Sequence, residues 1–402
     1  MRTLLNYINK IGILASLFLF LFLLNPFDLN MLIAYPIVAV TLSKKGFFLR
    51  NIDSPFLLLL IFSVIYALFY AFDPIAGGQF IIAYSIFPVG FYLLGKYIYE
   101  KLNGNKEKLF YLLFFIGLLY SSTPLISVFL NIIEGGFGQI DRSLPLIWNG
   151  SLVSATIMGS YYTLNMCIPA ILIVRQKKTN WAFKIAAILV FLLSLACALR
   201  IGSRTQILIF IITLFCSLIY IIPRQSLKRN FMTFLIFFLG LYVIISNISF
   251  DLDQDWLSTF ASRMEKGGSD DIASGGGRSE RWVKSIENIF EKPLGWEAKE
   301  FGHSHNMWLD VLRVSGIIPF FLLVGFSIKS FFILKSKVLK NKTNLFLNNL
   351  LIVYFLALNL VFMVEPIFEG VLELFLLFCL LMGVVVKIEI AKPISQNDVL
   401  SE

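Results

Sequence analysis

The sequence predicts an all-α, polytopic integral membrane protein with about 12 transmembrane helices and one large extracytoplasmic loop. Hydrophobic residues make up 58% of the 402 residues, and the mean hydropathy is +0.80. Charged residues make up only 15%, against about a quarter in an ordinary soluble domain. Apolar stretches recur along the chain, and one longer polar segment, 250–306, interrupts them. We therefore expect a single transmembrane domain over 1–402, with 250–306 as its outer loop.

The individual spans follow from the roughly 20 apolar residues that a helix needs to cross the hydrocarbon core. Segment 1–10 and the apolar run after it resemble a signal peptide, but no small-residue cleavage site follows Leu24. Asn25 to Asp28 are typical of a turn, so we interpret 11–24 as the first span. The spans are expected at 11–24, 31–43, 55–72, 78–99, 107–133, 153–174, 181–199, 205–222, 230–249, 307–334, 344–364 and 370–386.

Charge predicts the orientation of the chain. Most of the 34 Lys and Arg residues fall in alternate loops, and loops rich in Lys and Arg stay cytoplasmic. Both termini are therefore expected in the cytoplasm and 250–306 outside. The same bias accounts for the net charge of +9 without a nucleic-acid partner, and anionic membrane lipids are the expected contact of these loops.

A glycine-rich turn lies inside the outer loop. Gly275, Gly276 and Gly277 precede Arg278 and Arg281. Apolar residues at helical spacing follow, which predicts an amphipathic surface helix at about 279–290. Backbone N–H groups at such a turn can bind a phosphate, but a flexible hinge before a helix with solvated arginines fits equally. No Gly-Lys-Ser/Thr follows, so the turn is not a Walker loop.

Arg200 and Arg204 break the charge pattern on the outer side. The short outer loops contain no other basic residue except Arg142. Arginines at a membrane boundary either extend to the headgroups or meet an anion. An anionic ligand on the outer face would explain this exception.

Both histidines of the chain, His303 and His305, lie at the end of the outer loop. A histidine titrates near neutral pH and can take a proton from a hydroxyl. We expect His305 on the same helix as Arg313, about two turns or 12 Å above it. Gly316 and Pro319 then predict a kink. The alternatives are a structural role for the histidines, or a zinc site completed by glutamates of the loop, although catalytic zinc usually needs three protein ligands.

Four motifs in the second half of the chain resemble the O-antigen ligase and polymerase family of bacterial envelope glycosyltransferases. From Ser203 onward they occur in the family's order, whereas the first half of the chain matches only in hydropathy. The motifs are Ser203-Arg204, Gly277-Arg278-x-x-x-Trp282, Pro293-Leu294-Gly295, and His305-Asn306-x-x-Leu309 followed by Gly316.

The resemblance implies an all-helical membrane glycosyltransferase similar to the type C fold, located in the bacterial inner membrane with its active site facing the periplasm. It implies inverting, metal-independent transfer without a cofactor. The donor would be a glycan on undecaprenyl diphosphate, and the acceptor a hydroxyl of lipid A-core. Arg204 and Arg278 match the family's diphosphate-binding arginines, and His305 matches its proposed base. Position adds Arg200 and Arg281 as diphosphate ligands.

Arg313 and His303 are expected to support this site from neighbouring positions. A polymerase that extends a lipid-linked repeat unit stays open, because the segment between Pro293 and His305 is shorter than in some ligases. A flippase for a lipid-linked sugar is the alternative of another class. It would need charged residues deep within several spans, and the expected spans have few away from their ends.

Overall fold

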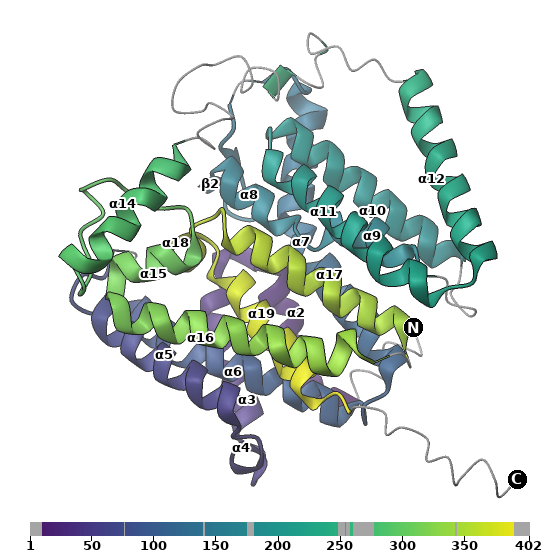
Figure 1. Cartoon of the computed structure of the whole chain (residues 1–402). Helices are drawn as coiled ribbons and strands as arrows, with labels where there is room; N and C mark the ends of the chain where they lie inside the picture. The colour runs from purple at the N-terminus through teal and green to yellow at the C-terminus, as the bar shows by residue number, and fades with distance from the viewer. Residues whose placement is uncertain are drawn as a thin grey trace, which may run out of the picture.

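The computed structural model describes residues 10–75, 77–139, 141–174, 181–247, 254, 258–259, 277–341 and 344–389. Within these ranges the chain is almost entirely helical (Figure 1). The strands there are β1 (Leu144–Pro145) and β2 (Leu152–Val153), which pair antiparallel. The predicted turn residues Gly275 and Gly276, and most of the outer loop before them, lie outside the described residues.

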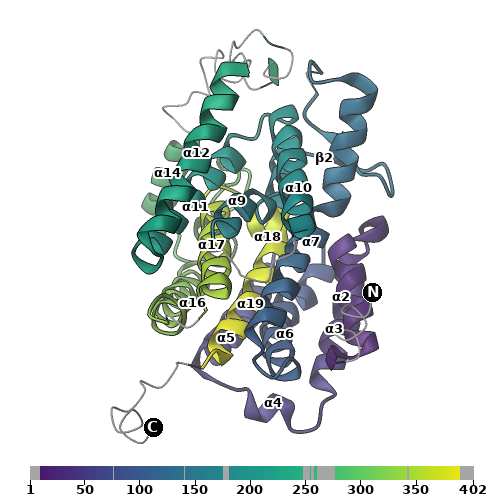
Figure 2. The ribbon, with the colours of Figure 1, turned by 90° about the vertical axis from the view of Figure 1, so that its right-hand side faces the viewer.

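The helices form a bundle whose neighbours often lie far apart in sequence (Figure 2). The first half contains α2 (Ile13–Leu24), η1 (Pro26–Asp28), α3 (Asn30–Leu42), α4 (Phe47–Arg50), α5 (Ser54–Tyr70), α6 (Gln79–Lys101), α7 (Lys106–Gly135), α8 (Ala155–Tyr161), η2 (Asn165–Cys167), α9 (Ile168–Leu172) and α10 (Trp181–Arg200). The second half contains α11 (Arg204–Ile221), η3 (Ile222–Arg224), α12 (Leu227–Asn247), α14 (Arg278–Glu291), α15 (Met307–Ser315), α16 (Ile317–Leu334), η5 (Lys335–Leu339), α17 (Leu345–Phe362), α18 (Ile367–Gly370) and α19 (Leu372–Lys387).

Six helices of the described chain are long and apolar enough to cross a membrane. They comprise Gln79–Lys101, Lys106–Gly135, Trp181–Arg200, Arg204–Arg224, Ile317–Leu339 and Leu345–Phe362. Helices α2, α3 and α5 are apolar but shorter. The protein is therefore an all-α membrane protein, while the described helices show six such spans rather than the twelve expected.

Two of the expected spans are interrupted. Segment 153–174 divides into α8, η2 and α9, and Asn165 at the break donates to the hydroxyls of Ser121 and Ser194 on α7 and α10. Segment 307–334 divides at Gly316, whose backbone has φ 74°. This break lies where the sequence predicted a kink. At the second break the freed N–H of Ile317 donates to the Pro293 carbonyl, as broken helices within a membrane protein require of exposed backbone groups.

The tightest helix contact joins α6 to α19 through two glycines. A Cβ atom at Gly95 would lie 2.0 Å from the Leu380 carbonyl oxygen, and one at Gly383 would lie 2.0 Å from the Tyr92 carbonyl oxygen. Small residues at such crossings let two backbones approach closely, as is common between membrane helices. The backbone of α19, which leads back to the candidate site, is thus packed directly on α6.

Replacing Gly383 with Ala is therefore expected to destabilise the protein by about 1–3 kcal/mol, as overpacking of a tight core does. Thermal unfolding in detergent would measure the loss. Gly325→Ala is the matched control, because a Cβ there would meet its nearest atom at an ordinary 3.7 Å. Equal unfolding temperatures for the two variants would contradict the close approach of α6 and α19.

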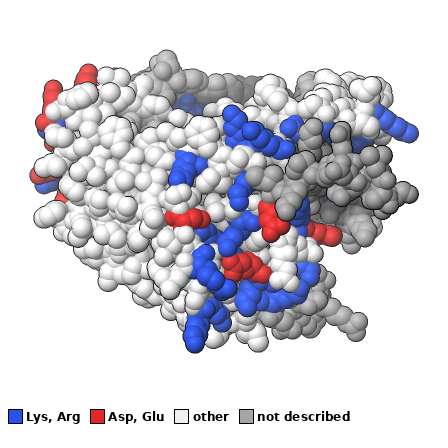
Figure 3. Space-filling view, turned by 60° about the horizontal axis from the view of Figure 1, so that its bottom comes forward, with Lys and Arg blue, Asp and Glu red and all other residues white. Residues whose placement is uncertain are grey.

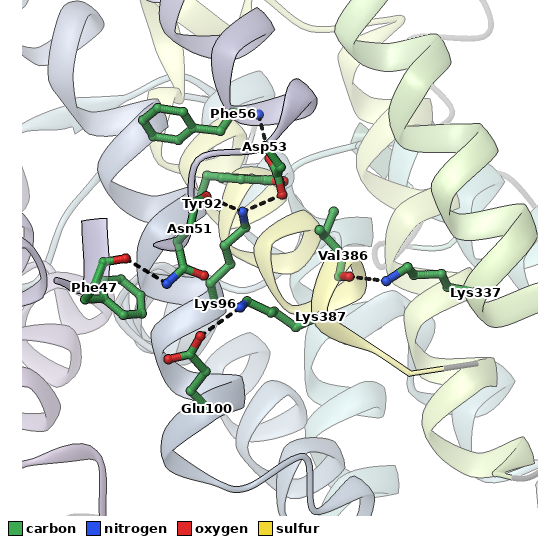
Figure 4. A network of polar contacts seen from close by, with 10 residues as sticks. All are labelled: Phe47, Asn51, Asp53, Phe56, Tyr92, Lys96, Glu100, Lys337, Val386 and Lys387. Carbon is green, nitrogen blue, oxygen red and sulfur yellow. Dashed lines mark hydrogen bonds and ion pairs between the residues drawn. The ribbon is translucent and has the colours of Figure 1, made fainter. Parts of the chain in front are cut away.

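One end of the bundle gathers basic side chains (Figure 4). Lys96 Nζ lies 2.5 Å from Asp53 Oδ2 and donates to the Asn51 carbonyl at 2.6 Å. Lys387 pairs with Glu100 at 2.7 Å, which brings the ends of α6 and α19 together. Lys and Arg also gather over part of the face shown in Figure 3. These contacts lie between loops that the distribution of Lys and Arg predicted to be on the same side of the membrane.

The other end holds α14, α15 and α18, at the left of Figure 1. The short helix α18 is fixed there by aromatic packing. The ring centroid of Phe368 lies 4.9 Å from that of Tyr66 and 5.0 Å from that of Phe375. The hydroxyl of Tyr84 donates to the Phe368 carbonyl at 2.6 Å. These contacts set the position of Glu369, the next residue.

Candidate functional site

The site begins at α14, whose first residue is Arg278. Gly277, in front of it, has φ 75°, a conformation that favours glycine. On the inner side of α14, Trp282 Nε1 donates to the Ser304 carbonyl at 2.9 Å, and the hydroxyls of Ser285 and Ser304 lie 2.7 Å apart. Helix α14 is therefore bonded to the loop that carries both histidines.

The outer side of α14 leaves large apolar side chains exposed. Val283, Ile286 and Phe290 are all exposed, Phe290 by 87%. The predicted apolar face is divided, because Trp282 and Ile289 instead pack inward beside Trp296 and Leu312. Helix α14 spans the segment expected to be a surface helix, and it has one face on the protein and one open.

The histidine loop is shaped by Asp310 of α15. The carboxylate of Asp310 accepts from the backbone N–H of Ser304 at 2.7 Å and of Asn306 at 3.2 Å. Asn306 then caps α15, since its side chain accepts from the N–H of Trp308 and Leu309. These bonds close a turn over 304–306.

His305 lies in this turn with φ 52°, and α15 begins only at Met307. The expectation that His305 shares a helix with Arg313 is therefore wrong, because Asn306 forms the helix cap. A non-glycine residue with positive φ stores strain of order 1–3 kcal/mol, and such strain clusters at functional sites. The turn places the His305 ring outside α15, beside the ring of His303.

The environment of His305 favours the neutral imidazole. Burial, and then the charges of Arg278, Arg281 and His303, lower its pKa to about 4. Its Nδ1 atom is buried without a hydrogen-bond partner among the described residues. A neutral ring near pH 7 can accept a proton, and a bound anion that neutralised the arginines would raise its pKa.

His303 has the opposite environment. Its Nδ1 lies 2.6 Å from Glu369 Oε2, and its ring centroid lies 6.4 Å from that of His305. The hydrogen bond to Glu369 raises the pKa of His303 although burial opposes this. The other oxygen of Glu369 pairs with the guanidinium of Arg313, which is almost fully buried. Burial works against ionisation of Glu369, but His303 and Arg313 together lower its pKa.

The two arginines of α14 face this loop and the α17–α18 connection. Arg278 Nη2 lies 3.5 Å from Glu365 Oε1, and Arg281 donates to the His303 carbonyl at 3.1 Å. Both guanidinium groups keep part of their surface accessible. The structure thus brings together Arg278, Arg281, Arg313, His303 and His305 from the residues that the sequence singled out.

Arg200 and Arg204 lie at the same end of the bundle but on other elements. Arg200 is fully buried and donates to the carbonyls of Gln139 and Asp141 at 3.2 Å, so it holds the segment after α7 rather than a ligand. Arg204 is the half-buried first residue of α11. Helix α8 connects it to the site, since Gly159 lies against Ser203, and Ile157 lies against Gly370 beside Glu369.

The motif Pro293-Leu294-Gly295 forms a backbone joint with the break between α15 and α16. The N–H of Ile317 donates to the Pro293 carbonyl, and the N–H of Trp296 donates to the Arg313 carbonyl, both at 2.9 Å. A Cβ at Gly295 would lie 2.4 Å from the Arg313 carbonyl oxygen, and one at Gly316 would lie 2.4 Å from that of Pro293. Two of the sequence motifs therefore form one structural unit behind the histidine loop.

Sequence reasoning missed the acidic members of the site, which are Asp310, Glu365 and Glu369. Their signal was present: Glu365, Glu369 and Glu373 recur every four residues within an otherwise apolar stretch. Acidic residues at that spacing share one helical face, and buried carboxylates are rarely unpaired. In the structure Glu365 pairs with Arg278 of the outer loop and Glu369 pairs with Arg313 of α15.

Comparison with known proteins assigns the chain to no family. No protein-family model matches the chain, and no curated protein matches its sequence. In the described part of the chain, no group of three or more His, Cys, Asp or Glu side chains is arranged to hold a metal ion. What the site can do therefore rests on the residues themselves.

Proposed function

We propose that this protein is a membrane glycosyltransferase of the O-antigen ligase type. It would transfer a glycan from undecaprenyl diphosphate to a hydroxyl of lipid A-core. The observation that supports it best is the convergence of Arg278 and Arg281 with a neutral His305 at one end of an apolar bundle. This set offers cations for a diphosphate and an acceptor for a hydroxyl proton.

The proposed reaction uses each group in one role. His305 takes the proton of the acceptor hydroxyl, whose oxygen attacks the anomeric carbon of the donor. Arg278 and Arg204 bind the departing diphosphate, and Arg281 adds a third guanidinium. Fixed cations that meet charge as it develops are a large source of catalysis, so the proposal requires neither a metal nor a cofactor.

The proposed topology places this site at the periplasmic face of a bacterial inner membrane. Twelve spans, with both termini cytoplasmic, would put the basic end shown in Figure 4 inside, as the positive-inside rule requires. The opposite end, with α14, would then face the periplasm. The exposed Val283, Ile286 and Phe290 fit a helix lying in the lipid interface, where the diphosphate of a lipid-linked donor would be.

The purified protein in proteoliposomes, supplied with a lipid-linked glycan and lipid A-core, is expected to produce the glycosylated lipid. A chelator is expected to leave the rate within about twofold, because the charge of the leaving group is met by guanidinium groups rather than by a metal. Mass spectrometry of the lipid products would measure both. Loss of transfer on chelation, reversed by a divalent metal, would contradict the metal-independent reaction.

A polymerase is the second candidate, because only a short segment separates Pro293 from His305. The same residues would then activate a hydroxyl on another lipid-linked repeat unit. Omitting lipid A-core separates the two candidates: a polymerase would lengthen the lipid-linked glycan, whereas a ligase would leave it unchanged.

A further inference from the structure

His303 and Glu369 form a second polar pair that the proposed reaction does not yet use. The Nδ1 atom of His303 is engaged by Glu369 at 2.6 Å, so Nε2 is the nitrogen left for a ligand. The His303 side chain is 40% exposed, whereas that of Glu369 is 7% exposed. A buried carboxylate thus holds an accessible imidazole from behind.

Glu369 is itself fixed, through its carboxylate and through the preceding residue. Arg313 pairs with its other oxygen, Phe368 is locked in the aromatic cluster, and Tyr84 bonds to the Phe368 carbonyl. The His303 backbone is held as well, since its carbonyl accepts from Arg281. Rigid support of this kind is what a group needs to act at a defined position.

We propose that His303 is a second catalytic residue, which donates its Nε2 proton to the departing diphosphate while His305 takes the proton of the acceptor hydroxyl. This inference rests on the proposed transfer from a lipid diphosphate. The bond between the anomeric carbon and the phosphate oxygen breaks with its electron pair on that oxygen, and the acceptor oxygen forms the new bond. Water then returns the proton from His305 to His303, so no other reactant is needed.

The charges around the two rings support this division. Glu369 on α18 and Asp310 and Arg313 on α15 act on His303, and Arg278 and Arg281 on α14 act on His305. Glu365 before α18 pairs with Arg278, and Tyr66 on α5 interacts with Glu369 and Arg313. Glu369 raises the pKa of His303, whereas burial, and then the charges of Arg278 and Arg281, lower the pKa of His305 to about 4. Two titratable groups whose pKa values are shifted in opposite directions are typical of an acid and base pair.

Activity should therefore depend on pH from two sides. It appears as His305 loses its proton above about pH 4, and it is lost as the pH rises through the raised pKa of His303. Glu369→Gln removes the anion that stabilises protonated His303, so the basic limb should move to lower pH and the acidic limb should stay. His303→Gln should lower kcat by about 100-fold with little change in the acceptor KM, and should abolish the basic limb.

The decisive experiment observes the two histidines directly. They are the only histidines in the sequence, so ¹³C-labelled histidine gives two NMR signals, and His303→Gln assigns them. His303 should titrate above its ordinary value of about 6.5, and farnesyl diphosphate should shift its signal while farnesol should not. The NMR titration can be measured whether or not the protein transfers a glycan. The His303→Gln variant should fold, because the His303 side chain is partly exposed.

A His303 signal that titrates at or below the ordinary value, or that ignores farnesyl diphosphate, would overturn the inference. An unmoved basic limb in Glu369→Gln protein that is still folded at the assay temperature would also overturn it. If glycan transfer itself is not found but His303 responds to the diphosphate, the proposed function fails, the catalytic role of His303 fails with it, and only diphosphate binding beside His303 stands.

Discussion

His305→Ala is expected to lower the rate of glycan transfer by about 10²–10⁴-fold, the usual contribution of a general base. The variant should still bind the donor, because Arg278 and Arg281 remain in place. It should also fold, since His305 lies in a turn whose backbone is held by Asp310 and Asn306 rather than by its own ring. Transfer in proteoliposomes, with donor binding measured separately, would check both.

Lys284→Ala is the matched control for this prediction. Lys284 is exposed on α14, in the helix that carries both arginines, and its loss should leave the rate within about twofold, since surface changes away from a site have small effects. A His305→Ala variant as active as Lys284→Ala would remove the base assignment. Reduced donor binding with an unchanged maximal rate would instead assign His305 to binding.

Arg313→Met is expected to cost about 3–5 kcal/mol of stability, because it removes the buried cation that pairs with a buried carboxylate. Arg313 is almost fully buried, and the carboxylate of Glu369 that it pairs with is 7% exposed. Reduced unfolding temperature and denaturant midpoint in detergent would measure the loss.

The double variant Arg313→Met, Glu369→Met should recover most of that stability, since replacing both members of a buried pair by apolar groups is often neutral. It should not recover activity, because His303 has then lost its support. A free energy of unfolding of Arg313→Met within about 1 kcal/mol of the wild-type value would show that the pair is solvated in the native protein.

The sequence predicted well those features that depend on local chemistry. The glycine before Arg278 and the break near Gly316 were both predicted, because a positive φ restricts the residue type to glycine in most cases. The position of His305 was not predicted. Asn306 before an apolar run is itself a helix-start signal, and it would have placed His305 outside α15.

Features that depend on tertiary pairing could not be assigned from local patterns. Hydropathy measures the length of an apolar segment but not its continuity, so the expected span 153–174 hid the break at Asn165. Arg200 was interpreted as a boundary arginine and Arg313 as a supporting residue of the site, yet the first bonds to loop carbonyls and the second pairs with Glu369. Their partners lie 61 and 56 residues away in sequence.

Covalent transfer of the glycan by the cluster around His305 can be measured through both of its products. The most direct test supplies proteoliposomes with a lipid-linked glycan and an acceptor and follows free undecaprenyl diphosphate together with the glycosylated acceptor. We expect both products in equal amounts, only when the acceptor is present, and only with His305 intact. Passage of the intact lipid-linked glycan across the bilayer, with no free diphosphate and no new glycoside, would contradict it and identify a flippase.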